Sequence, residues 1–299
     1  MNRREFLFTG LGAAGALTLS GCCSGTCGCG KAKFRLGMAG WTLHHLKVDE
    51  ALRFCEKHGF HYLCVKNFHL PYDAKPAQVA EFLRKCADHG VAPYAAGPIE
   101  FGTADDAKRG FDFVAALGLK TMVGVPWQPD AQGRTDWSHL CSNVPLCETV
   151  AGLANEYGIN FAIHNHGSKA ESGVPTLWPT PDAIMRTLGP LGPRMGLCLD
   201  IAYTHADGFD VPAVIRRYGD RVFDCHVRCL SDAGNGGSGV DPAHRVFDYD
   251  GVFSALKDIG YAGWTGLELA HDDPKQPMET WERWIDESHA YFENLIERT

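Results

Sequence analysis

The chain has 299 residues, of which 45% are apolar and 21% charged, a composition typical of globular proteins. Its formal net charge of -8, without any cluster of lysine and arginine, argues against binding to a nucleic-acid backbone, which needs a basic face. The length admits two domains, but one barrel of about 250 residues is also common, and the charge suits a small neutral ligand.

The first 21 residues are predicted to be an export signal. Arg3 and Arg4, followed by Glu-Phe-Leu, resemble the twin-arginine export motif. The apolar run 6–19 is shorter than the about 20 residues that cross a bilayer, so a removed signal fits better than an uncleaved anchor helix. The segment 19–22 (LSGC) resembles a bacterial lipobox, which makes Cys22 the lipidated residue.

These motifs imply a lipid-anchored protein of the bacterial cell envelope that faces the periplasm, with no other attachment to the membrane. Residues 22–33 form a Cys/Gly-rich tether in this interpretation. The spacing of Cys23, Cys27 and Cys29 lacks the paired CxxC of zinc sites, so a tether is favoured over a metal site. In an oxidising compartment, Cys141 and Cys147 are close enough in the sequence to form a disulfide.

From residue 34 onward, short apolar runs alternate with amphipathic stretches, which predicts alternating strands and helices. The strand candidates are 34–40, 62–67, 92–97, 121–125, 160–165, 195–200, 222–228 and 264–269. Helical patterns include 48–58, 76–89, 104–117 and 250–259. Glycines follow five helical runs, as C-caps do: Gly59, Gly90, Gly118, Gly158 and Gly260.

Eight strand-helix pairs without a linker predict a single-domain α/β fold over 34–299, the closed (β/α)8 TIM barrel. A doubly wound open sheet is the alternative. It would need a phosphate-binding glycine loop after an early strand, and the segment 37–40 (GMAG) does not match that loop.

Polar residues stand at the ends of the last four predicted strands, where barrel enzymes carry their catalytic groups. His164 and His166 share one face of the fifth strand because side chains alternate. Asp200 closes the sixth strand, His226 lies in the seventh and Glu268 interrupts the apolar eighth. Two imidazoles and two carboxylates suit one divalent ion of Mn, Fe, Co or Zn. We therefore predict a metal site of His164, Asp200, His226 and Glu268.

From residue 34 onward the chain resembles the xylose isomerase-like TIM-barrel superfamily. This group includes sugar isomerases and 3-epimerases, inosose dehydratases, 3-keto-glycoside lyases and endonucleases of the type-four repair class. The motifs that carry the resemblance are 66–71 (KNFHLP), 163–167 (IHNHG), 196–201 (GLCLDI), 224–228 (DCHVR) and 266–269 (GLEL). The resemblance implies the same metal ligands, which in the family are usually Glu, Asp, His and Glu.

The chain departs from this pattern at two positions. Epimerases carry a glutamate where His164 stands and use it, with the glutamate of the eighth strand, as an acid and base pair. Because a metal-bound imidazole is no longer a free base, elimination by a single base fits at least as well as epimerisation by two. Tyr203 stands where related barrels often place a histidine, and His205 either takes over that contact or merely sits on the loop.

Further candidates follow the other predicted strands and suit sugar binding at the barrel mouth. They are Trp41, His44, Lys66, His69, Glu100 and Trp127. Trp41 could equally serve packing. Arg228 occupies the place of a family lysine that contacts substrate oxygens, or forms an ion pair with Asp232 or another acid at the rim. Glu171 either replaces the missing carboxylate or belongs to a surface loop.

Together these observations predict a metal-dependent sugar isomerase or epimerase. The metal polarises a carbonyl, Glu268 removes the neighbouring proton, and His166 is the second acid or base. A lyase or dehydratase of a keto-sugar, keto-glycoside or inosose is the alternative. A sugar-binding lipoprotein without catalysis and a phosphodiesterase-like hydrolase, which needs a second metal, are the remaining alternatives.

The lipobox generates a first prediction. Cys22→Ser should abolish labelling by a radioactive or clickable fatty acid and release the protein from the membrane fraction, because the thiol that receives the lipid is gone. Cys29→Ser in the tether is the matched control and should remain labelled. Unchanged membrane association of Cys22→Ser would contradict the anchor.

Overall fold

The computed structural model describes residues 33–136, 139–168, 177–228, 247–271 and 275–299. The expected signal, tether and Cys22 lie outside these ranges, as do Glu171 and Asp232. Among the helices that are described, none is both long and apolar enough to cross a membrane.

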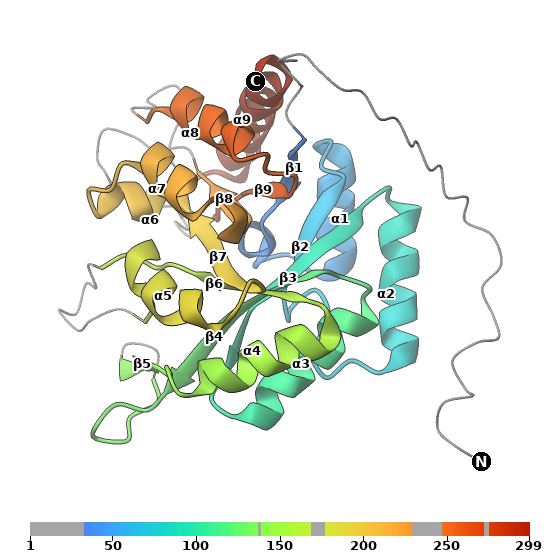
Figure 1. The fold of residues 1–299 in the computed structure, drawn as a ribbon. Coiled ribbons are helices and arrows are strands. Elements are labelled where there is room, and N and C mark those ends of the chain that lie inside the picture. The colour runs from blue at the N-terminus through green and yellow to red at the C-terminus, as the bar shows by residue number, and fades with distance from the viewer. Residues whose placement is uncertain (1–32, 137–138, 169–176, 229–246, 272–274) are drawn as a thin grey trace, which may run out of the picture. The chain divides into compact units, whose positions relative to one another are not determined.

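Within the described residues, eight parallel strands close into a barrel (Figure 1). They are β1 (Arg35–Met38), β2 (Tyr62–Val65), β3 (Ala92–Phe101), β4 (Thr121–Gln128), β6 (Asn160–His164), β7 (Met195–Asp200), β8 (Val222–Val227) and β9 (Trp264–Leu267). Closure comes from β1, which pairs with β2 on one side and β9 on the other, and from the pairing of β3 with β4. The predicted TIM barrel is confirmed, and the open sheet is excluded.

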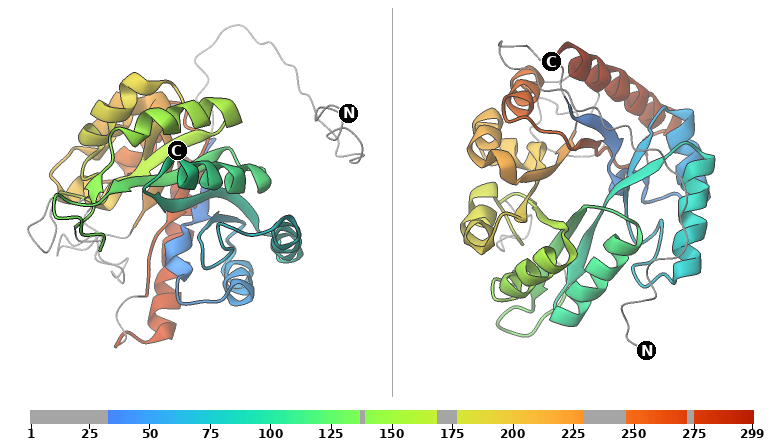
Figure 2. Two further views of the ribbon diagram at one scale, coloured as in Figure 1. Left: turned by 90° about the horizontal axis from the view of Figure 1, so that it is seen from below. Right: turned by 45° about the vertical axis from the view of Figure 1, so that its right-hand side comes forward.

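Helices surround the strands, as Figure 2 shows from two further sides. They are α1 (Val48–Lys57), α2 (Pro76–Asp88), α3 (Ala104–Ala116), α4 (Leu146–Tyr157), α5 (Pro181–Leu188), α6 (Ile201–Ala206), α7 (Val211–Tyr218), α8 (Tyr249–Asp258) and α9 (Met278–Arg298). The five glycines expected at helix ends all have φ between +65° and +75°. This left-handed conformation is open to glycine at little cost, so the predicted C-caps are confirmed.

The main difference from the predicted strands lies at β4. It runs past the barrel and pairs antiparallel with a short strand, β5 (Cys141–Ser142), through Trp127 and Ser142. A strand of two residues leaves no periodic pattern in the sequence. The sequence left open whether Cys141 and Cys147 form a disulfide, and the structure has both as free cysteines; the buried Cys147 thiol donates to the backbone oxygen of Asn143 (3.5 Å).

The core between strands and helices is apolar and holds fully buried rings such as Phe161, Phe253 and Trp281. Trp281 of α9 also donates a hydrogen bond from Nε1 to the backbone oxygen of Leu269 (2.6 Å). Thr42 donates to the oxygen of Leu267 (2.9 Å) and accepts from the nitrogen of Leu269 (3.1 Å). These bonds fix the backbone on both sides of Glu268.

Candidate metal centre

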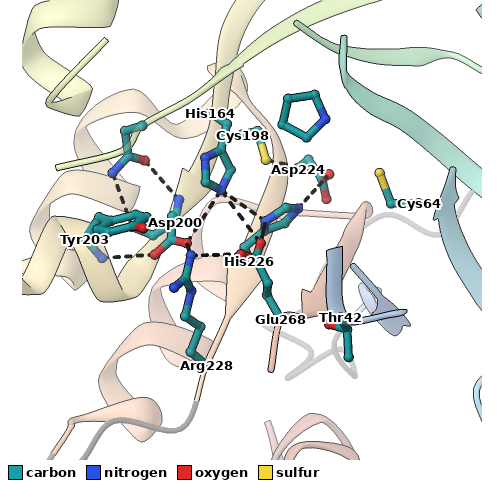
Figure 3. A network of polar contacts seen from close by, with 12 residues as sticks. Thr42, Cys64, His164, Cys198, Asp200, Tyr203, Asp224, His226, Arg228 and Glu268 are labelled. Atoms are coloured by element: carbon teal, nitrogen blue, oxygen red, sulfur yellow. Dashed lines mark hydrogen bonds and ion pairs between the residues drawn. The ribbon is translucent and has the colours of Figure 1, made fainter. Parts of the chain in front are cut away.

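Four ionisable side chains converge at the carboxyl end of four neighbouring strands (Figure 3). His164 ends β6, Asp200 ends β7, His226 lies next to the end of β8, and Glu268 directly follows β9. The parallel register places Asp200 beside His226 and His226 beside Gly266. One ligand atom from each of the four residues lies within 4.8 Å of those of the others.

The distances within the cluster suit a single ion. Nε2 of His164 lies 3.1 Å from Nδ1 of His226 and 3.5 Å from Oδ2 of Asp200. Oε2 of Glu268 lies 2.5 Å from Nδ1 of His226 and 4.0 Å from Nε2 of His164. Ligand atoms placed about 2.1 Å from a tetrahedral ion would be separated by about 3.4 Å. Small shifts of the side chains would therefore complete the coordination.

A second set of three possible ligands replaces the two carboxylates with the thiol of Cys198. This thiol donates to Oδ2 of Asp224 (3.7 Å), and burial holds the pKa of Cys198 well above its usual range. A protonated thiol is a poor ligand. The set with Asp200 and Glu268 offers one ligand more, and its two negative charges attract a cation, so it is the stronger candidate.

Arg228 braces the two carboxylates. Its Nη2 donates to Oδ2 of Asp200 (2.6 Å) and to Oε1 of Glu268 (2.9 Å), and its guanidinium lies 4.6 Å from the ring centre of Tyr203. Burial favours the neutral acids, but Arg228, His164 and His226 together outweigh it and lower the pKa of both carboxyl groups. Arg228 thus forms an ion pair with the carboxylates of Asp200 and Glu268, and it also lies in the wall of the cavity described below.

Asn165 fixes the neighbouring strand ends. Its Oδ1 accepts from the backbone nitrogen of Asp200 (2.9 Å), and its Nδ2 donates to Oγ1 of Thr204 (3.2 Å). The carboxylate oxygen of Asp200 that Arg228 does not contact, Oδ1, caps α6 by accepting from the backbone nitrogen of Tyr203 (2.9 Å). Such outer contacts orient metal ligands and hold the site in shape.

The histidines of the cluster are buried and differ in their environment. Burial lowers the pKa of His226, but the hydrogen bond with Glu268 and the charges of Glu268, Asp224 and Asp200 together outweigh burial and raise the pKa overall. Burial lowers the pKa of His164 and takes that of His166 to about 3. His166 is therefore a neutral imidazole, and its ring centre lies 4.8 Å from that of His164.

A cavity of about 380 Å³ opens over the cluster. Its wall contains four residues that the sequence indicated as substrate contacts, Trp41, Lys66, Glu100 and Arg228, together with His166. It also contains Tyr203, Gly97 and Pro98. Tyr203 replaces the histidine of the related barrels here, and its place at the start of α6, capped by Asp200, is the sequence signal that could have indicated it.

Four expected contacts are not part of the cavity wall. His44 stacks on the ring of Trp41 (centres 4.7 Å apart). His69 is buried, and its Nδ1 accepts from the backbone nitrogen of Lys66 (3.2 Å). The ring of Trp127 packs over Gly102, and the exposed His205 contacts Phe247. Tyr203, rather than His205, is part of the cavity wall.

The family model of the xylose isomerase-like TIM barrel matches residues 52–295. The chain therefore belongs to the xylose isomerase-like TIM barrel family, whose members with known activity include sugar isomerases, epimerases and dehydratases. The cluster and cavity thus lie in a fold that carries enzymes.

Among curated proteins, the inosose isomerase of Bacillus velezensis is 26% identical over 243 residues, which cover 76% of this chain and 85% of that protein. An inosose dehydratase of Lacticaseibacillus casei is 24% identical over 199 residues, covering 56% of this chain and 63% of its own. A solved structure of the IolI protein, which has a bound zinc atom, has a TM-score of 0.65 at 21% identity and covers 89% of this chain and 99% of its own.

The two possible ligand sets generate a second prediction. Asp200→Ala or His226→Ala should lose most of the metal found in the wild type, because each removes one of four ligands. Cys198→Ala is the matched control and should keep it. Metal content after dialysis, measured by mass spectrometry, tests this; full occupancy in Asp200→Ala together with loss in Cys198→Ala would place the ion at the thiol set instead.

Proposed function

We propose that this protein is a divalent-metal-dependent enzyme that removes a proton next to the carbonyl of a sugar or cyclitol. The observation that carries the proposal is the convergence of His164, Asp200, His226 and Glu268 beside a cavity, which His164, His226 and Glu268 line. A divalent ion held there would supply Lewis-acid polarisation of a carbonyl oxygen. The inosose isomerase and the zinc-containing IolI structure, as relatives, support the same chemistry.

Glu268 is the proton acceptor in this proposal. Arg228 holds its Oε1, so Oε2 is the oxygen that remains beside the ligand nitrogens and the cavity. His166 lies on the β6 side of the same cavity as a neutral imidazole. Its place in the cavity wall after β6, whereas Glu268 follows β9, makes it the second proposed acid or base.

The surroundings favour isomerisation or elimination over epimerisation by two carboxylates. His164 occupies the position of the second glutamate of epimerases. The carboxylates in the described cavity wall are those of Glu268 and of the exposed Glu100. A single base beside the ligands suffices for transfer of a proton or for β-elimination. The inosose dehydratase among the relatives supports elimination as the second candidate.

A hydrolase with two metals is less well supported. Both sets of possible ligands in the described residues contain His164 and His226, so they compete for one ion. Two-metal sites instead hold their ions about 3.5–4 Å apart with separate ligands.

We also propose that the enzyme is exported by the twin-arginine route and anchored at Cys22. The support is the order of the two motifs at residues 3–4 and 19–22. A small sugar-like molecule that reaches the cell envelope would then be the substrate.

The role of Glu268 generates a third prediction. In D₂O at saturating zinc or manganese, wild-type protein should exchange the hydrogen next to the carbonyl of an inosose or a 3-keto-glucoside, as followed by NMR. Glu268→Gln should exchange about 10²–10⁴-fold more slowly, because the amide keeps the shape but cannot accept a proton. The exposed Glu148→Gln should behave as wild type.

His164→Glu is the companion variant and should retain metal, because carboxylate oxygens and imidazole nitrogens bind zinc at similar distances of about 2.0–2.2 Å. Exchange at the wild-type rate in metal-saturated Glu268→Gln would identify another base, with His166 the first to examine. No exchange by the wild type with either compound would contradict the proposed function.

A further inference from the structure

Lys66 is a buried cation with few partners. Only 8% of the residue is exposed, and Nζ donates to the backbone oxygen of Pro98 (3.2 Å), its one hydrogen-bond partner among the described residues. An ammonium has three donors, and burying them without acceptors costs free energy. Since Lys66 is part of the cavity wall, the remaining donors can be satisfied by an oxygen of a ligand.

Lys66 directly follows β2, and β2 is four strands away from β7, which carries Asp200, in either direction around the closed sheet. Glu268 follows β9, which is two strands away from β2. A ligand in the cavity that contacts Glu268 with one edge can therefore present a different edge to Lys66.

Trp41 forms a platform beside this ammonium. Its indole is 44% exposed, and the ring centre lies 5.8 Å from Nζ of Lys66. His44 stacks on the indole almost in parallel (10° between the planes), and the ring of Phe68 meets it edge-on at 6.2 Å. An exposed, supported aromatic ring at a cavity mouth offers a flat apolar face to the C–H groups of a second ring or chain.

The size of the cavity is suited to a sugar ring. About 380 Å³ corresponds to roughly thirteen water molecules at about 30 Å³ each. A hexose has twelve non-hydrogen atoms, so this cavity has room for one such ring. A group attached to that ring would extend over Trp41, and the oxygen that joins the two would lie beside Lys66.

We propose that Lys66 is a catalytic acid that protonates the departing oxygen in a β-elimination, and that the departing group rests on Trp41. The substrate class is then a keto-glycoside, or another β-alkoxy ketone, with its carbonyl toward the metal ligands. The inference rests on the proposed function, because elimination begins with removal of the same proton by Glu268.

The step balances without an oxidant or reductant. The C–H bond next to the carbonyl breaks and its proton passes to Glu268; its electron pair forms a C=C bond as the C–O bond at the β-carbon breaks. Lys66 gives a proton to the departing oxygen, so an alcohol leaves, and the proton on Glu268 can return through solvent to Lys66. Burial lowers the pKa of Lys66, which makes the ammonium a better donor, although Glu100 opposes part of this effect.

Two 3-keto-β-D-glucosides with different leaving groups test the proposal. Methoxide needs a proton to leave, whereas 4-nitrophenolate leaves without one. Lys66→Met should release methanol about 10²-fold or more slowly than wild type, but 4-nitrophenol less than tenfold more slowly. Lys66→Arg should resemble Lys66→Met because a guanidinium keeps the charge but does not give up its proton. Lys120→Met is the matched control: the exposed Lys120 directly precedes β4, at the end of the barrel away from the cavity, so this variant should match wild type with both compounds.

Metal content of each variant shows that the barrel and the ligand cluster are intact. An equal loss with both leaving groups, or full activity of Lys66→Arg toward the methyl glycoside, would overturn the assignment of Lys66 as the acid. If the wild type exchanges the hydrogen next to the carbonyl but releases neither alcohol, the elimination proposal fails while the proposed function stands. Absence of both exchange and release contradicts the proposed function itself.

Discussion

The carboxylates of Asp200 and Glu268 must be stabilised at a place from which water is largely excluded. Asp200 is fully buried and Glu268 is 9% exposed. Arg228 hydrogen-bonds to both and offsets one of their two negative charges, which leaves a balance of -2 + 1 = -1. That remaining charge, beside two imidazole nitrogens, is what a divalent cation would stabilise. The barrel therefore supports a buried cluster whose ligand types and charge suit a divalent cation.

The shape of the barrel determines where this cluster can act. Parallel strands bring their carboxyl ends together, so residues at the ends of β6, β7, β8 and β9 form one cluster although they are far apart in the sequence. Another part of the cavity wall comes from residues in or after β1, β2 and β3, the first strands in the sequence. It contributes different groups: the ammonium of Lys66, the indole of Trp41 and the exposed carboxylate of Glu100. In the proposed reaction, a substrate between these groups meets Glu268 as the proton acceptor and Lys66 as the proton donor.

Much of this arrangement could be predicted from the sequence, because it depends on local patterns. All eight barrel strands begin within one residue of the predicted starts, since each is a short apolar run after a glycine-capped helix or a loop. Asp200 and Glu268 could be identified because a carboxylate in an apolar strand has no role in packing. The rhythm of strands and helices was enough to place them at one rim.

Contacts between distant segments could not be predicted in this way. His69 and Trp127 follow the predicted strands, as catalytic residues do, but the backbone turns His69 toward the nitrogen of Lys66. Trp127 lies within the longer β4, where it pairs with β5. Arg228 was open to two interpretations because its partners, Asp200 and Glu268, are 28 and 40 residues away. The joint position of Lys66 and Pro98 depends on the packing of β2 beside β3, which no periodicity encodes.

The central claim is that one divalent ion is bound by these four side chains, and anomalous X-ray scattering from crystals of the zinc-loaded protein tests it most directly. A single peak about 2.0–2.2 Å from atoms of His164, Asp200, His226 and Glu268 is the predicted result. A peak bonded to the sulfur of Cys198, or four side chains joined only by the hydrogen bonds described above at saturating zinc, would contradict the account.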